Sequence, residues 1–252
     1  ETPAKVGIQR GLHRTWRKTD EAYDRDVIKD KQNKYSELQF YGSFCYVEIG
    51  PCHVFDKETE HEKHALYAAL AEENIERNAA AALQQLSASQ VNSRAGKSKV
   101  PSKSKESQGY ERGNRTRGGI DGYRHREDIL RARLFPWIRD LQERTGNTYM
   151  VHKDGAPAHR SRIASDYYSF NGIQKWLSPP YSPEFNAAEH AWPWLRRHIT
   201  TDYPLSTTVE ECAQQWREEW QELGNNMHLI RGWINSLDNK IRRCLQDQGG
   251  NR

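Results

Sequence analysis

The sequence lacks long apolar runs, and no stretch of it approaches the roughly 20 consecutive apolar residues that a membrane-spanning helix needs. No charged segment followed by an apolar one marks a signal peptide near its start. We therefore expect a protein that works in solution, with no membrane partner.

Cysteine is also scarce, with four residues in a chain of 252. None of them stands in the CxxC spacing of zinc sites, and four are too few for a disulfide framework, so we expect reduced thiols and no zinc. The signatures GxGxxG and GxSxG are missing as well. The segment AGKS at 95–98 lacks the upstream glycine of a phosphate-binding loop, because Val91 stands there. The sequence thus predicts no small-molecule cofactor.

The modest net charge of +4 is unevenly placed along the chain. Residues 94–118 contain eight lysines and arginines but only two glutamates, among many Ser and Gly residues. Such a composition buries too little apolar surface to offset the entropy lost on ordering, so we interpret 88–119 as a basic flexible insert. It is either a solvated linker or an arm that contacts phosphates through Lys97, Lys99 and Lys103.

Residue patterns predict alternating strands and helices around this insert. The predicted strands lie within 38–55, at 148–151 and at 173–177. The predicted helices cover 58–87, 129–141 and 163–170, begin again near Ala187 after a proline-rich loop at 178–186, and end with 209–223 and 230–241. Thr207 and Glu210 fit a capping box, and Gly224 separates the last two helices. This order predicts an α/β fold with helices on both faces of a sheet.

Ligands of such sheets gather at the carboxyl ends of strands, which is where Asp154 falls, in the segment HKDGAPAH. The best candidate for a second acidic ligand is Glu189, in the first turn of the helix after the proline-rich loop. Plainer roles fit too: Asp154 before Gly155 suits a turn, and Glu189 three residues after Asn186 suits a helix capping box. We expect the nearby histidines, His159 and His190, to be structural hydrogen-bond partners.

The joint spacing of the two acids is not explained by turn and cap chemistry. Thirty-four residues separate them, and they stand in the motifs KDGAPAH and PPYSPEFNAAEHAW. These motifs resemble the mariner superfamily of DNA transposases, most closely a branch common in fungal genomes. The segments RGLHRTWR, YGSFCYVEIGPCHVF, GGIDGYRHREDIL and QGGNR extend the resemblance over nearly the whole chain.

The resemblance implies a mixed sheet of ribonuclease H-like architecture and an Asp-Asp-Glu triad, with Asp154 and Glu189 as two of its three members. Glu1 matches the glutamate of a DE pair, so the first aspartate is expected one residue before this chain, and the fragment alone is expected to be inactive. The expected domains are a catalytic domain at 1–200, truncated at its N-terminus, and a C-terminal helical extension at 201–252.

The implied reaction is metal-dependent DNA strand cleavage and strand transfer at transposon ends. Two divalent ions about 4 Å apart can activate the attacking oxygen and stabilise the departing one. Carboxylates from separate elements suit Mg²⁺ or Mn²⁺, which prefer hard oxygen ligands. On this interpretation Asp154 and the missing aspartate bridge both ions, and Glu189 holds one.

The resemblance also implies DNA as partner, nuclear localisation, an N-terminal DNA-binding region outside this chain, and allows a homodimer. Arg10, Arg14 and Arg17 are either phosphate contacts or exposed loop charges. The alternative class is a catalytically inactive or host-adopted transposase remnant that acts as a DNA- or protein-binding module. The residue before Glu1 separates the two, since aspartate there keeps the enzyme hypothesis.

Overall fold

The computed structural model describes residues 1–6, 37–94, 109–110, 120–179 and 182–247, and all structural statements concern these. The predicted DNA contacts lie outside the described residues: Arg10, Arg14, Arg17, Lys97, Lys99 and Lys103. Within the described part, no helix has the length and apolar character to cross a membrane.

Five strands form two ladders. The antiparallel one has the order β1–β2–β3, with β1 at Thr2–Lys5, β2 at Glu37–Phe44 and β3 at Ile49–Phe55. The parallel one pairs β4 (Val151–Lys153) with β5 (Lys175–Leu177). The helices, in chain order, are α1 (Glu60–Arg94), α2 (Gly122–Arg124), the π-helical η3 (His125–Leu134), α3 (Phe135–Thr145), α4 (Pro157–Arg160), α5 (Arg162–Phe170), the 3-10 turn η4 (Pro183–Phe185), α6 (Ala188–Asp202), α7 (Val209–Asn225) and α8 (Met227–Gln246).

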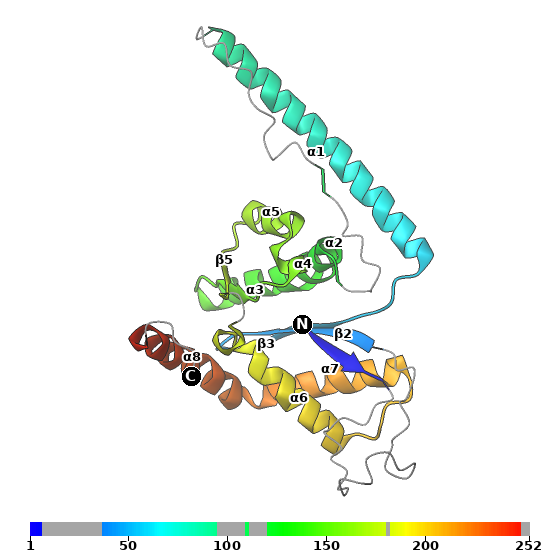
Figure 1. Ribbon diagram of the computed structural model, residues 1–252, viewed down its shortest axis with the longest axis vertical. Coiled ribbons are helices and arrows are strands. Elements are labelled where there is room, and N and C mark those ends of the chain that lie inside the picture. Colours follow the sequence, from blue (N-terminus) through cyan, green and yellow to red (C-terminus); the bar gives the residue numbers. More distant parts are fainter. Residues whose placement is uncertain (7–36, 95–108, 111–119, 180–181, 248–252) are drawn as a thin grey trace, which may run out of the picture.

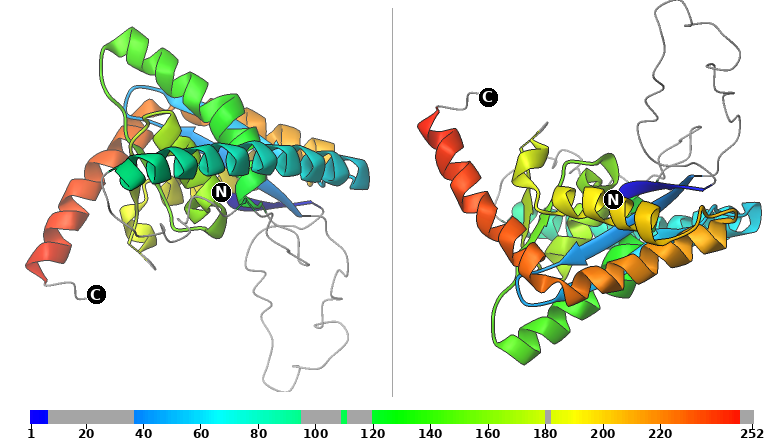
Figure 2. Two further views of the ribbon diagram at one scale, coloured as in Figure 1. Left: turned by 90° about the horizontal axis from the view of Figure 1, so that it is seen from above. Right: turned by 90° about the horizontal axis from the view of Figure 1, so that it is seen from below.

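The antiparallel sheet lies between two helical layers, with α2 to α5 on one side and α6 to α8 on the other, while α1 projects away from both (Figure 1). The views in Figure 2 show α8 leaving the rest of the molecule towards the C-terminus. The predicted α/β class, with mixed strand pairings and helices on both faces, is confirmed, and the element order agrees with a ribonuclease H-like architecture.

Strand β2 explains why both faces of the sheet are covered. Successive side chains of a strand point to opposite faces, and apolar residues here occupy both. Phe40 packs on Trp216 and Trp220 of α7, with ring centroids 5.0 and 5.7 Å away. Its neighbour Tyr41 belongs to the opposite core, with Phe135 and others from η3, α3 and α5. Both helical layers are therefore fixed to one strand.

The same packing crosses the predicted domain boundary at residue 200. That position lies inside α6, and Trp216 and Trp220 of the predicted extension are buried in the core shared with β1 to β3. The indole Nε1 of Trp220 also donates to the Gly50 carbonyl at 2.9 Å. Residues 201–252 thus do not form a separate core, and the division into two domains stays a prediction.

The two short strands begin later than predicted. Residues 148–150 have no regular structure, because β4 pairs only with the three residues of β5. Strand β5 begins at Lys175 rather than 173, since the amide of Ile173 donates to the Tyr168 carbonyl and so closes the end of α5. Tyr149 and Ile173 pack against the core without pairing in a strand, whereas Met150 is exposed.

Three helix boundaries also differ from prediction. Helix α1 runs to Arg94, so residues 88–94 are helical and do not belong to a flexible insert. The capping box is Thr208 with Glu211, one residue beyond the predicted pair. Gly224 lies inside α7 instead of after it. The missing side chain allows the helix to approach β3, since a Cβ there would stand 2.7 Å from Ile49 Cγ2.

A glycine-to-alanine pair tests the packing of α7 on the sheet. A Cβ at Gly42 would clash with the ring of Trp220, whereas one at Gly232, on the exposed side of α8, meets nothing within 4 Å. We expect Gly42→Ala to lower the free energy of unfolding by about 1–3 kcal/mol, as overpacking does. Gly232→Ala should be neutral or raise it by up to about 1 kcal/mol. Urea titrations followed by Trp fluorescence measure both, and equal effects would contradict the packing described.

Candidate active site

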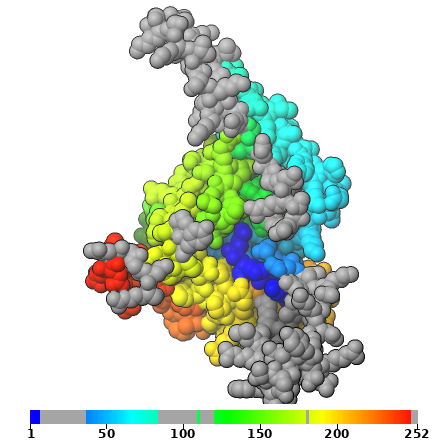
Figure 3. Space-filling model, in the orientation of Figure 1, coloured from blue at the N-terminus to red at the C-terminus, as the bar shows by residue number. Residues whose placement is uncertain are grey.

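The two predicted acids converge. Asp154 follows β4 directly, and Glu189 lies in the first turn of α6, in opposite helical layers. Both line one surface hollow, together with the loop before α6. Its other lining residues are Gly155, Ala156, Arg160, Leu177, Ser178, Pro179, Ser182, Pro183 and Asn186. The start of the chain lies between the green and yellow parts on the face shown in Figure 3.

Asp154 is fixed through one of its two carboxylate oxygens. Oδ1 accepts from the backbone amide of Ala156 at 3.0 Å and from His159 Nδ1 at 2.6 Å. The Ala156 contact is the turn expected at this sequence, so the turn and a site role coexist. Within the described chain Oδ2 has no hydrogen bond, and the side chain stays 38% exposed. The His159 hydrogen bond, above all, holds the pKa of Asp154 well below its usual range.

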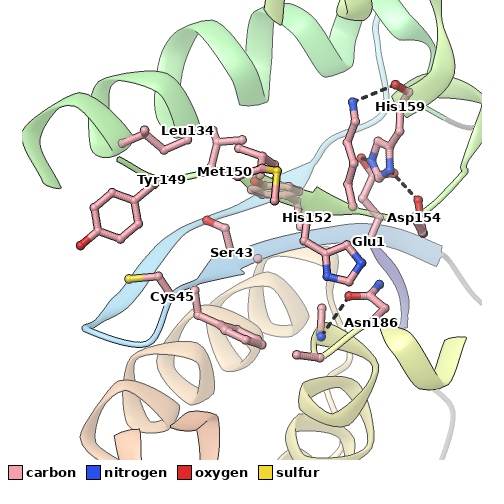
Figure 4. A pocket seen from close by; sticks show the side chains of 18 of the residues that line it. Glu1, Ser43, Cys45, Leu134, Tyr149, Met150, His152, Asp154, His159 and Asn186 are labelled. Carbon is pink, nitrogen blue, oxygen red and sulfur yellow. Dashed lines mark hydrogen bonds and ion pairs between the residues drawn. The ribbon is translucent and has the colours of Figure 1, made fainter. Parts of the chain in front are cut away.

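His159 joins Asp154 to a second carboxylate, that of Glu1. Burial alone would lower the pKa of His159, but the hydrogen bond to Asp154 and the nearby negative charge of Glu1 raise it above its ordinary value. Its Nε2 lies 3.5 Å from Glu1 Oε1, and His125 Nδ1 lies 3.3 Å from the same oxygen. Burial would raise the pKa of Glu1, yet the two histidines hold it below its usual range. Figure 4 shows Glu1, His159 and Asp154 at one end of the neighbouring cavity.

Lys153 anchors this arrangement from β4. Its buried ammonium donates to the His159 carbonyl at 2.8 Å and lies 4.3 Å from the centre of the Tyr168 ring. Burial lowers the pKa of Lys153 to about 8. The cavity beside it, of about 300 Å³, runs between the sheet and η3, α3 and β4, and its lining is largely apolar. Asp154 and His159 stand where this cavity meets the hollow.

Unlike Asp154, Glu189 has no hydrogen-bonded or ion-paired partner among the described residues, although the charges of the Glu1 α-amino group and Arg196 act on it. Burial raises its pKa, and the negative charge of Asp154 raises it further, while the α-amino group of Glu1 opposes them. The predicted capping box is wrong: Asn186 Oδ1 accepts from the Ala188 amide at 3.2 Å, and the Glu189 side chain makes no capping bond. Glu189 is therefore a half-buried carboxylate close to a second one.

The two other histidines near the acids, His190 and His125, make different contacts. His190, beside Glu189, contacts Lys240 Nζ at 2.8 Å and stacks on Trp233, so it ties α6 to α8. No sequence pattern indicates a role for His125, since it is a single histidine within a helical segment. The structure places it 2% exposed, with its ring centre 4.4 Å from that of His159.

Comparison with known proteins adds family information to this geometry. Residues 112–210, which include both acids, match the family model described as DDE superfamily endonuclease. The Tcb2 transposase of a transposable element of Caenorhabditis briggsae is 26% identical over 123 residues, which is 49% of this chain and 42% of the relative. The Tcb1 transposase of the same species is 22% identical over 132 residues, covering 52% and 45%. The chain thus spans less than half the length of these relatives.

Among solved structures, the Mos1 transposase catalytic domain with raltegravir and Mg aligns at 16% identity and a TM-score of 0.43, over 54% of this chain and 67% of that one. The match over residues 112–210 makes this part of the chain similar to the DDE superfamily endonucleases. Within that class, the two relatives support a mariner-type DDE transposase, and the resemblance predicted from the motifs is confirmed.

A double-mutant cycle tests the contact between Asp154 and His159. The depressed pKa of Asp154 gives a stabilisation that is present above about pH 4 and lost as the pH falls, while the raised pKa of His159 gives one that is present below about pH 6.5 and lost as the pH rises. The coupling between Asp154→Asn and His159→Gln should therefore be larger at pH 5.5 than at pH 9.

Urea unfolding of the four proteins at both pH values gives this coupling free energy. The exposed pair of Asp238 and Arg242, 2.9 Å apart, serves as the control and should show the same small coupling at both pH values, since arginine stays protonated. A coupling between Asp154 and His159 that is unchanged or larger at pH 9 would contradict the charge arrangement described.

Proposed function

We propose that this chain is the catalytic domain of a transposase that cleaves and rejoins DNA strands at transposon ends with divalent metal ions. The observation that carries the proposal is the shared hollow. Asp154 and Glu189 are far apart along the chain, yet they line one surface, and the charge of one raises the pKa of the other. Paired carboxylates that repel one another are the donor set expected of a divalent cation site.

The donor atoms fit Mg²⁺ or Mn²⁺. In the part of the chain that the structure describes, Asp154 Oδ2 and the Glu189 carboxylate make no hydrogen bonds, so hard oxygen donors remain free. When bound, two such ions would supply activation of the attacking oxygen and stabilisation of the departing one. Asp154 and Glu189 would hold them.

The surrounding residues prepare these two acids for the proposed role. Ala156 and His159 fix the orientation of Asp154 and keep it ionised, so one oxygen is held while the other stays exposed. Glu189 sits in the first turn of α6, where the helix dipole favours a negative charge. A rigid position for each carboxylate limits the geometry that the bound ions can take.

We further propose that the residue preceding Glu1 completes the site, as the resemblance implies. Glu1 and Asp154 line the same cavity, so a residue joined to the amino group of Glu1 would lie near the proposed site. An aspartate at that position would provide the third carboxylate. DNA as the substrate belongs to the same proposal, in line with the family match. Action in the nucleus and a homodimer are proposed from the resemblance alone.

Strand cleavage by a protein that includes the residue before Glu1 tests the proposed function. We expect Mg²⁺- or Mn²⁺-dependent nicking of a transposon-end duplex. Asp154→Asn and Glu189→Gln should each lower the rate at least about 100-fold, the loss typical of removing one electrostatic contribution to a transition state. The control Glu184→Gln, on the exposed side of η4 just before α6, should keep the parental rate.

The cleavage assay distinguishes the proposed transposase from a remnant that only binds DNA and from a nuclease. Cleavage that survives Asp154→Asn or Glu189→Gln would remove that residue from the metal site. DNA binding without any cleavage in either metal, by a protein with aspartate before Glu1, would favour the remnant that only binds. Cleavage without joining would favour a nuclease of the same fold.

Arg160 offers a test of DNA contact close to the proposed site. It is exposed, lines the hollow, and has side-chain atoms 3.8 Å from where a Cβ on Gly155 would lie. If it contacts a phosphate, Arg160→Ala should weaken binding equally for all sequences and reduce the slope of log K against log salt by about 1. Fluorescence anisotropy at several salt concentrations measures the slope, with Arg242→Ala on α8 as control. An unchanged slope would argue against the contact.

A further inference from the structure

A second cluster of metal-ligating side chains lies behind Asp154. Glu1 precedes β1, His125 begins η3 and His159 belongs to α4, and one donor atom from each lies within 4.8 Å of the other two. His125 is 2% exposed and His159 6% exposed, so the cluster is enclosed. Figure 4 shows Glu1 and His159 close to one another at one end of the cavity.

Four buried polar atoms of this cluster have no hydrogen-bond partner among the residues that the structure describes. They are Glu1 Oε1, both ring nitrogens of His125, and His159 Nε2. The separations of 3.3 and 3.5 Å between the histidine nitrogens and Glu1 Oε1 do not make satisfactory hydrogen bonds. Buried polar groups are nearly always satisfied, so converging unpartnered atoms from three side chains indicate a missing partner.

The separations match the edges of a metal coordination tetrahedron. Zinc binds histidine nitrogen and carboxylate oxygen at about 2.0–2.1 Å, which places neighbouring ligands of a tetrahedron about 3.3–3.4 Å apart. Two edges here measure 3.3 and 3.5 Å. We propose that Glu1, His125 and His159 form a site for a single Zn²⁺ ion, with water as the fourth ligand.

The hydrogen bond of His159 to Asp154 prepares the ring for this role. A neutral imidazole that donates its Nδ1–H to Asp154 carries its free electron pair on Nε2, which is the atom directed at Glu1. A carboxylate that orients a metal-bound histidine in this way is a common arrangement. The ion would then hold His159, and His159 would hold Asp154 at the edge of the hollow. This inference does not depend on the proposed function.

The experiment uses the purified chain, freed of metal and kept in excess Mg²⁺. We expect one equivalent of Co²⁺ to bind with the intense visible absorption of four-coordinate cobalt, and Zn²⁺ to displace it. Competition with a chromogenic chelator gives the Zn²⁺ affinity. His125→Gln should lower that affinity at least 100-fold, while Glu189→Gln and the exposed control His228→Gln should leave it within about threefold.

Two results would overturn the site. One is a parental chain that binds no stoichiometric Co²⁺, or binds it with only the weak absorption of an octahedral ion. The other is an equal loss of Zn²⁺ affinity in Glu189→Gln and His125→Gln, which would place the ion among the carboxylates of the hollow. Circular dichroism checks that each variant folds, and Glu1→Gln replaces His125→Gln if that protein does not. Because the readout is metal binding, failure here leaves the DNA-cleavage proposal intact.

Discussion

Strand β2 has apolar side chains on both faces, and the positions of the two acids depend on this. Phe40 fixes the helical layer that contains α6, and Tyr41 fixes the layer that contains η3, α3 and α5. Asp154 follows β4 and Glu189 lies in the first turn of α6, and both line the same hollow. Residues far apart in sequence thereby share a hollow at one end of the sheet.

The charges at this hollow are unequally compensated. Asp154, His159 and Glu1 form a connected group in which a histidine with a raised pKa lies between two carboxylates with lowered pKa values. Glu189 stands outside it, and its raised pKa reflects burial and the nearby negative charge. A protein that only needed a stable surface would gain from removing such a carboxylate. A half-buried carboxylate close to a second one fits the metal-binding role that we propose for Glu189.

The sequence predicts the acids, the fold class and most helices, because each carries a local signal: a spaced motif, an apolar stripe or a terminal glycine such as Gly146 at φ 69°. It misplaces the ends of β4 and β5, which are set by mutual pairing of three residues rather than by composition. Gly224 signals a helix end, yet tertiary contact with Ile49 is what requires it. The cluster of Glu1, His125 and His159 has no sequence signature, since its members come from three separate elements and none of them is a cysteine.

The most direct test of the central claim is the position of a divalent ion relative to the two acids. Anomalous diffraction from crystals of a protein that includes the residue before Glu1, soaked in Mn²⁺, locates such an ion without any assay. We expect a manganese peak within about 2.0–2.6 Å of oxygens from both Asp154 and Glu189. Well-ordered carboxylates with no ion between them at saturating Mn²⁺ would contradict the account.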